Sequence, residues 1–322
     1  MTVANEAGKK GMMEFGVHLP LLAFRGQAFS LARLLEYTET AEQLGFTTVC
    51  ANDHLLFSRP WLDSLTALAA ILTKTPRMRL MTTVVLPVIR GPVPLAKSLA
   101  ALDVLSGGHL SAGVGPGSLP EDYALVDIAF EERWKRFDEA IQLLRRLLQR
   151  DSPPFSGQFY AEASKPLEPF PTQEPGVPIW IGSWGSEAGL RRVARLGDGW
   201  LASAYHVTPA SFADALARLN QSLQQAGKEP ASFPHALGTM FFYLTEGRRR
   251  AEELLGEVVS PALGRPVEQL RERLLIGTPA ECADKLLKLQ AAGVQQVFLW
   301  PVEDEVSQLV RFHQQVLRQL PR

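Results

Sequence analysis

The sequence has few cysteines and no excess of charge of either sign. Its two cysteines, Cys50 and Cys282, are too far apart for a disulfide framework or a zinc site, so we expect a reducing, cytoplasmic location. A formal net charge of -1 gives no electrostatic reason to expect nucleic acid or an anionic membrane as a partner. No run approaches the roughly 18 apolar residues that span a bilayer, and residues 1–12 are too polar for a signal peptide. We therefore expect an enzyme that acts on a small molecule.

Several catalytic motifs are also missing. The zinc-protease HExxH, the P-loop and the nucleophile elbow GxSxG do not occur. The loop at 113–118 approaches the dinucleotide-binding pattern GxGxxG, but Ser118 stands at the third glycine and the loop follows the fourth predicted strand instead of the first. His18 lacks the second histidine of a barrel metallohydrolase. A metal-dependent hydrolase stays an alternative only through ligands that are distant in sequence, and we predict no metal residues.

Hydrophobic patterns predict eight strands that alternate with helices, which indicates an α/β fold, a (β/α)₈ TIM barrel with insertions. The alternative is a doubly wound open sheet. The last strand favours the barrel, because it is apolar throughout and suits a closing strand better than an exposed edge. The predicted strands are residues 14–19, 47–52, 80–86, 110–114, 178–182, 199–203, 237–244 and 296–300.

Helical periodicity fills most of the sequence between these strands. Residues 246–275 suggest two further helical pieces, broken at Ser260-Pro261 and Arg265-Pro266, and the proline-rich residues 151–178 suggest a long ordered loop. We expect one barrel domain over residues 13–322 and a disordered extension over residues 1–12. The predicted helices are residues 31–44, 61–72, 95–105, 131–149, 188–196, 212–226 and 280–291.

Two segments at predicted strand ends carry candidate chemistry. His54 and Asp53 follow the second strand, where a barrel has its active site; His54 could exchange a proton and Asp53 could orient it or a ligand. The alternative is that both only bond to loop backbone. Residues 182–186, GSWGS, follow the fifth strand and open a helix, so their amides and serine hydroxyls could hold a phosphate. The alternative there is plain N-capping by Ser186.

Other residues near the strand ends allow two interpretations each. The glycines at 113–117 allow close approach of a flat ring, or simply make a tight turn. Arg25 and Arg90 could hold an acidic tail, or could be solvated loop residues. Four aromatic residues could wall an apolar pocket or belong to the core: Trp61, Trp184, Tyr205 and Trp300.

Five blocks of sequence resemble the bacterial luciferase-like family of flavin- and deazaflavin-dependent oxidoreductases. They are AEQLGFTTVCANDHL (41–55), PLAKSLAALDVLSGGHLSAGVGPGS (94–118), ERWKRFDEAIQLLRRLL (132–148), PIWIGSWGSEAGLRRVARLGDGW (178–200) and LIGTPAECADKLLKLQAAGVQQVFL (275–299). Together, in this order and spacing, they cover nearly the whole chain.

The resemblance implies a (β/α)₈ barrel that binds reduced FMN or the deazaflavin coenzyme F420 across the strand ends. It implies a non-proline cis peptide near Thr83-Val84, a role for His54 in proton transfer, contact of Asp53 with the ring edge, and often a homodimer. The expected reaction is monooxygenation or hydride transfer on a small, fairly apolar substrate. The implied cofactor-binding residues are Asp53, Thr83, Val84, Gly115, Gly117, Ser118, Gly182, Ser183, Trp184, Gly185 and Ser186.

The chain also departs from parts of the family. The deazaflavin-dependent sugar-phosphate dehydrogenases have an acid where this chain has Ser118 and a tryptophan where it has Ser58, so we do not expect that activity. The long insertion that bears the lid of true luciferases is missing, so we do not expect light emission. A flavin-binding protein without turnover is the alternative from another functional class.

Overall fold

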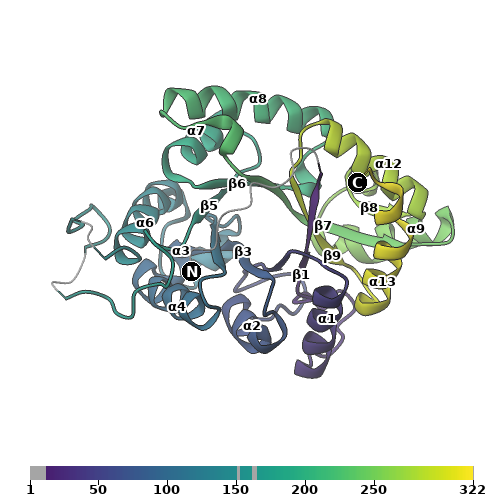
Figure 1. Cartoon of the computed structure of the whole chain (residues 1–322), viewed down its shortest axis with the longest axis horizontal. Coiled ribbons are helices and arrows are strands. Elements are labelled where there is room, and N and C mark those ends of the chain that lie inside the picture. The colour runs from purple at the N-terminus through teal and green to yellow at the C-terminus, as the bar shows by residue number, and fades with distance from the viewer. Residues whose placement is uncertain (1–11, 151–152, 162–164, 322) are drawn as a thin grey trace.

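Eight parallel strands close into a barrel with helices around its outside (Figure 1). The computed structural model describes residues 12–150, 153–161 and 165–321, so residues 1–11 of the predicted extension lie outside the described residues. Strand β9 pairs with both β1 and β7, which confirms the predicted closing strand and excludes the open sheet. The barrel strands are β1 (Glu14–His18), β2 (Thr48–Ala51), β3 (Arg79–Val85), β4 (Leu110–Val114), β5 (Ile179–Gly182), β6 (Gly199–Ser203), β7 (His235–Leu244) and β9 (Gln296–Pro301).

The predicted helices are present with shifted ends. The helix predicted at 61–72 begins only at Ser64, because the carboxylate of Asp63 accepts a hydrogen bond from the Thr66 amide at 2.8 Å and caps it. These helices are α1 (Leu31–Gln43), α2 (Ser64–Ile71), α4 (Pro92–Leu105), α6 (Arg133–Leu147), α7 (Glu187–Leu196), α8 (Pro209–Gln225) and α12 (Pro279–Ala291). Three were not predicted: α3 (Pro87–Arg90), α5 (Pro120–Ala124) and α13 (Glu305–Gln315). The 3₁₀ turns are η1 (Leu72–Lys74), η2 (Phe130–Glu132), η3 (Ala204–His206), η4 (Pro230–Ser232) and η6 (Leu317–Gln319).

The segment between β7 and α12 differs from its prediction. The helix continues past Ser260-Pro261, because the turn before Pro261 is π-helical, and its wider hydrogen-bond spacing accommodates a residue without an N–H. The second predicted break, at Arg265-Pro266, is present, and it begins at Gly264, which has a left-handed backbone with φ 62°. A short strand then pairs with the end of β7 outside the barrel. The elements are α9 (Arg248–Leu254), η5 (Leu255–Val259), α10 (Ser260–Leu263), α11 (Val267–Arg273) and β8 (Leu275–Gly277).

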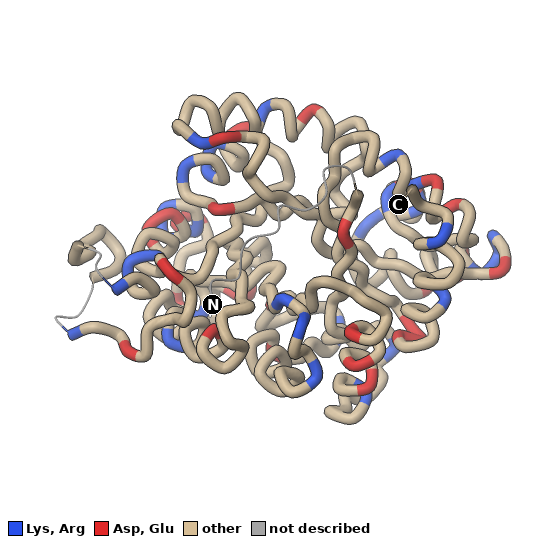
Figure 2. The backbone as a smooth tube through the Cα atoms, in the orientation of Figure 1, with Lys and Arg blue, Asp and Glu red and all other residues tan. Residues whose placement is uncertain are grey.

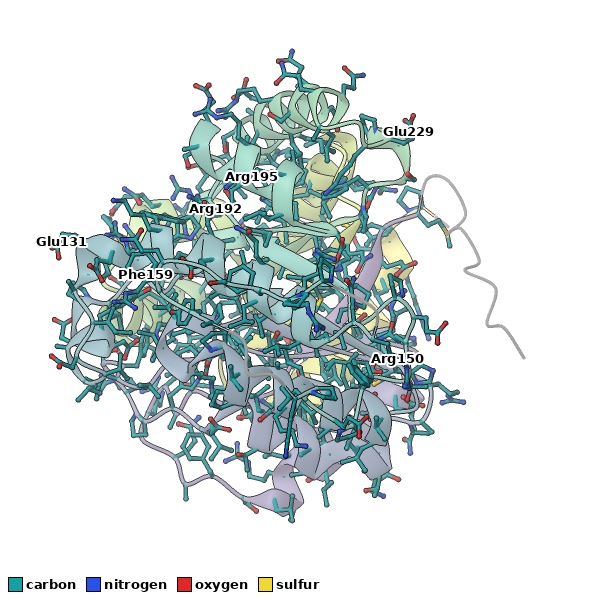
Figure 3. All side chains as sticks on the ribbon, turned by 90° about the vertical axis from the view of Figure 1, so that its left-hand side faces the viewer. Glu131, Arg150, Phe159, Arg192, Arg195 and Glu229 are labelled. Carbon is teal, nitrogen blue, oxygen red and sulfur yellow. The ribbon has the colours of Figure 1, made fainter. Side chains whose placement is uncertain are left out.

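The charged residues lie mostly on the outer helices and loops, with both signs interspersed (Figure 2). The barrel interior contains a separate apolar cluster of Cys50, Met81, Trp180, Leu201, Ala236 and Phe298. The described parts of the loop at 151–178 are held by two carboxylates. Glu139 of α6 accepts hydrogen bonds from three successive loop amides, including that of Phe159 (Figure 3), and buried Asp103 of α4 accepts two more.

Candidate active site

A cleft of about 420 Å³ lies over the C-terminal ends of β2 to β6 and the middle of β7. That volume is in the usual range for a small-molecule site. All the predicted site residues except Gly185 line it: Asp53, His54, Thr83, Val84, Gly115, Gly117, Ser118, Gly182, Ser183, Trp184 and Ser186. The barrel topology therefore brings together residues that are up to about 130 positions apart in sequence, as expected for strand ends of a barrel.

Strand β3 carries a bulge in the floor of this cleft. The Thr83-Val84 peptide is cis, as the resemblance implied, and the register of β3 against β4 shifts between Thr83 and Val85. The side chain of Asn52 accepts a hydrogen bond from the Val84 amide at 3.2 Å. The Val84 side chain therefore projects into the cleft from a fixed position.

Two of the predicted glycines make room for Val84. A Cβ on Gly115 would lie 2.6 Å from Val84 Cγ2, and a Cβ on Gly182 would lie 3.0 Å from Val84 Cγ1. In this structure the space beside these two glycines is taken by a side chain of the neighbouring strand, and the close approach of a flat ring to the Gly115 loop stays a prediction. Any larger residue at Gly115 would displace the bulge.

The turn from β5 into α7 forms a cradle. Ser186 caps α7 by accepting a hydrogen bond from the Gly189 amide at 3.2 Å, so the simpler capping interpretation holds. The cradle is more than a cap, because the Ser183 hydroxyl also converges on Gly189, where a Cβ would lie 2.4 Å from Ser183 Oγ and 3.0 Å from Ser186 Oγ. The first amides of a helix, two hydroxyls and the positive end of the helix dipole suit an anion.

Two arginines beside this cradle were missed by the sequence analysis. Arg133 lies 3.9 Å over the Phe130 ring and, within the part of the chain that the structure describes, has no carboxylate partner. Arg192 of α7 lies over the Trp134 ring at 4.5 Å and is paired with Asp138, which also binds Arg195 (Figure 3). The alternation of arginine and aromatic residues in ERWKRF marks Arg133 as a candidate, but only the fold places it beside the cradle, and this motif does not include Arg192.

Asp53 is fully engaged by other protein groups. It is only 3% exposed, and Arg90 binds both of its oxygens, at 2.7 Å through Nε and 2.6 Å through Nη2. Ser64 and the Leu86 amide also donate to it. Asp53 therefore does not orient His54 in this structure, and its proposed contact with a ring edge would have to be made around an existing ion pair.

His54 instead faces a different carboxylate. Its Nδ1 lies 3.7 Å from Oδ2 of Asp122 on α5, and its ring packs against Phe57 and Trp61 at 4.9 and 4.7 Å between centroids. Asp122 is 1% exposed, and its other oxygen accepts a hydrogen bond from the Leu56 amide at 2.8 Å. Asp122 is not among the site residues predicted from the sequence.

His18, which is buried, and His206, which is half-buried, form a polar wall behind the cleft. Burial lowers the pKa of His18 to about 3, so its ring is neutral; Nε2 accepts from the Thr239 amide at 3.0 Å, and Nδ1 therefore carries the proton. Burial, aided by Arg265 and Arg273, lowers the pKa of His206 to about 4.

His206 extends this polar wall towards the rim of the cleft. Its Nε2 accepts from Arg265 at 3.0 Å, so Nδ1 donates to Ser203 at 3.1 Å. Trp184 stacks on His206 at 4.0 Å between ring centroids. Ser203 and Thr239, joined at 3.2 Å, both line the cleft. The His206 tautomer therefore fixes the direction of the hydrogen bonds made by the Ser203 hydroxyl, which lines the cleft together with the Thr239 hydroxyl.

The remaining candidates divide between cleft and scaffold. Trp184 and Tyr205 line the cleft, whereas Trp300 is buried and stacked on His18 at 4.5 Å. Arg25 is paired with Glu303, and Arg90 with Asp53 and Asp63, so neither is free to hold an acidic tail as the sequence suggested. Ser58 donates to the Ala262 carbonyl.

Neither a metal site nor a membrane span emerges from the described residues. Residues 12–150, 153–161 and 165–321 contain no group of three or more histidine, cysteine or acidic side chains placed to hold a metal ion. None of the helices in these ranges combines the length and apolar character needed to cross a bilayer.

Comparison with known proteins matches the same segments. The family model described as luciferase-like monooxygenase matches residues 13–264. An uncharacterized protein from Mycobacterium tuberculosis is 30% identical over 229 residues, 69% of this chain and 77% of its own. The F420-dependent hydroxymycolic acid dehydrogenase of that organism is 27% identical, over 91% of this chain and 86% of its own. A monooxygenase crystal structure from Streptomyces bottropensis superposes with a TM-score of 0.82 at 25% identity, covering 95% of this chain and 99% of that one.

Proposed function

We propose, since the chain belongs to the luciferase-like monooxygenase family, that it is an oxidoreductase which uses reduced FMN to monooxygenate, or to transfer hydride to, a small and fairly apolar organic substrate. Coenzyme F420 is the alternative cofactor, and the F420 dependence of the hydroxymycolic acid dehydrogenase favours it. A cytoplasmic location and a homodimeric assembly belong to the same proposal.

The observation that carries the proposal is the order of the site residues around the barrel rim. Strands β2, β3, β4 and β5 are consecutive neighbours. The cradle follows β5, the Val84 bulge and the Gly115–Ser118 loop lie on β3 and after β4, and His54 follows β2. A phosphorylated planar cofactor would therefore have its phosphate at one side of the cleft, its ring across Val84, and its reacting edge towards His54.

The residues present fit such a group. The cradle at Ser183, Ser186 and Gly189 would hold the phosphate, because a Cβ at Gly189 would fill it. Arg133, which has no carboxylate partner among the described residues, would offset the charge. When bound, the cofactor supplies hydride, or, for a flavin, reactivity with oxygen. His54 would hold or accept a proton at the substrate. The hydrophobic rings of Phe57 and Trp61 beside His54 favour an apolar substrate.

The structure weakens one argument for F420. The acidic tail of F420 would need free cations, and Arg25 and Arg90 are both paired with carboxylates. FMN requires only the cradle and Arg133. We therefore keep FMN as the first cofactor and F420 as the second.

The test is a comparison of FMN and F420 on the purified protein. Each cofactor is titrated by its visible absorbance, and its reduced form is then followed with and without a panel of apolar ketones and aldehydes. We expect one cofactor to bind and its reduced form to be consumed faster when a substrate is added. Binding without substrate-dependent consumption would support the non-catalytic flavin-binding alternative, and binding of neither cofactor would overturn the proposal.

A further inference from the structure

Two buried polar atoms face each other next to the cleft without a hydrogen bond. Nδ1 of His54 and Oδ2 of Asp122 are both inaccessible to solvent and have no hydrogen-bond partner among the described residues. They lie 3.7 Å apart, which is slightly too long for a hydrogen bond. Buried polar atoms without partners are rare and call for an explanation. Here the two atoms face each other across this gap, and a small rotation of the imidazole would bring them within hydrogen-bond distance.

The chemistry of the two groups decides which proton position this pairing allows. An ionised carboxylate only accepts hydrogen bonds, and a neutral imidazole has one donor and one acceptor nitrogen. Oδ2 of Asp122 therefore favours the tautomer with the proton on Nδ1 of His54. Because Nδ1 is the buried nitrogen and His54 lines the cleft, Nε2 is the nitrogen that remains for a ligand.

We propose that Asp122 is a positioning residue that holds His54 in the Nδ1-protonated form, so that Nε2 presents its lone pair to the substrate as a proton acceptor. This inference rests on the proposed function for its catalytic meaning. Loose pairs of this kind in ligand-free sites commonly tighten when the ligand binds. The neighbouring carboxylate of Asp53 does not compete for the role, because Arg90 binds both of its oxygens.

The loop geometry supports the same assignment. Oδ1 of Asp122 accepts a hydrogen bond from the Leu56 amide at 2.8 Å, two residues after His54. The carboxylate therefore fixes the backbone of the histidine loop with one oxygen and faces the imidazole with the other. The rings of Phe57 and Trp61 limit the rotation of His54 on its other sides.

Asp122→Asn separates these two functions. The asparagine oxygen can still accept from the Leu56 amide, but its NH₂ group would face His54 Nδ1 as a donor and favour the opposite tautomer, with the proton on Nε2. Glu121→Gln is the matched control, because it removes one carboxylate charge from an exposed position on the same turn of α5.

The test is a long-range ¹H–¹⁵N spectrum of histidine-labelled protein without cofactor, recorded where His54 is neutral and assigned by loss of its signals in His54→Ala. We expect the Nδ1-protonated tautomer in the wild type and in Glu121→Gln, and the Nε2-protonated tautomer in Asp122→Asn. An Nε2-protonated wild type would overturn the proposal without any variant. An unchanged tautomer in folded Asp122→Asn would overturn it as well.

The catalytic consequence has a separate measurement. With the cofactor that binds, Asp122→Asn should lower kcat by about tenfold or more, since the base would be protonated at the wrong nitrogen, and should change the cofactor Kd by less than about twofold. Unchanged kcat with a switched tautomer would overturn the positioning role. Failure of the wild type to bind either cofactor would instead overturn the proposed function and leave the tautomer result standing.

Discussion

Arg90 donates two hydrogen bonds to the carboxylate of Asp53, at 2.7 and 2.6 Å, on the floor of the cleft between the ends of β2 and β3. From the sequence, the family resemblance implies contact of Asp53 with a ring edge, and Arg90 could hold an acidic tail or be a solvated loop residue. In the structure, the two groups form an ion pair with each other instead. Their ion pair ties the loop that carries His54 to α3, directly after the Val84 bulge, so it holds two parts of the candidate site in register.

Removing Arg90 should therefore destabilise the fold. Arg90→Ala leaves the carboxylate of Asp53 buried without its cation, which typically costs about 3–5 kcal/mol. Arg90→Lys should cost less, because an ammonium keeps the charge but cannot match both oxygens. Urea unfolding monitored by circular dichroism measures both. The exposed pair of Arg191 and Glu187 gives the control, since Arg191→Ala should change stability by less than about 1 kcal/mol. Equal losses for Arg90→Ala and Arg191→Ala would contradict this account.

Gly189→Ala should weaken binding of FMN and leave binding of riboflavin nearly unchanged. The added methyl group would lie 2.4 Å from Ser183 Oγ and occupy the cradle that we assign to the phosphate, which riboflavin lacks. We expect the FMN Kd to rise by about tenfold or more, the loss of roughly one charge-assisted hydrogen bond.

Flavin titration of Gly256→Ala provides the control for that substitution. Gly256 is also helical, but a Cβ there meets no atom within 4 Å. It should bind both flavins as the wild type does. Equal weakening of FMN and riboflavin by Gly189→Ala would place the phosphate elsewhere.

His54→Ala should reduce turnover and preserve the cofactor site. The imidazole lines the cleft on the β2 side, away from the cradle after β5. We expect kcat to fall by about a hundredfold, the usual contribution of a general acid or base, with a cofactor Kd within about twofold of wild type. Steady-state kinetics together with the absorbance titration decide the matter. Wild-type turnover in this variant would remove His54 from the mechanism.

The strands were predictable from sequence because their apolar runs are continuous. All eight barrel strands end within two residues of the prediction, and β4 and β6 match it in full. Strand β8 was missed because three residues carry too little pattern, and α13, which follows β9, was not predicted either. Position at a strand end was enough to predict that His54, Ser183 and Ser186 lie at the cleft, and their roles stay predictions.

The partners of these residues were not predictable. Which carboxylate faces His54 depends on how α5 folds back over the β2 loop, and no local pattern encodes that distance. Asp53, adjacent in sequence, therefore looked like the partner, whereas Asp122 is the carboxylate that the fold places there. Arg133 could not be predicted for the same reason, since it comes close to the cradle only when α6 and α7 pack side by side on the barrel.

Acid should destabilise the protein partly through His18. The pKa of His18 is lowered by burial from 6.5 to about 3, so the unfolded chain binds a proton that the folded chain does not. Stability therefore falls as pH drops below about 6.5, by up to roughly 1.4 kcal/mol per pH unit from this group, and rises as pH returns to neutral.

Urea unfolding between pH 6.5 and 4.5 tests this contribution. His18→Asn should be less stable near neutral pH but should lose less stability on acidification than the wild type. His313→Asn, on the outer helix α13, should keep the wild-type dependence. Parallel curves for the wild type and His18→Asn would show that His18 is not the group responsible.

The crystal structure of the protein with whichever of FMN and F420 binds more tightly tests the central claim most directly. We predict that the phosphate lies within hydrogen-bond distance of the Ser183 and Ser186 hydroxyls and near Arg133, with the ring against Val84. A phosphate bound away from the start of α7, or a ring outside the cleft, would contradict the account.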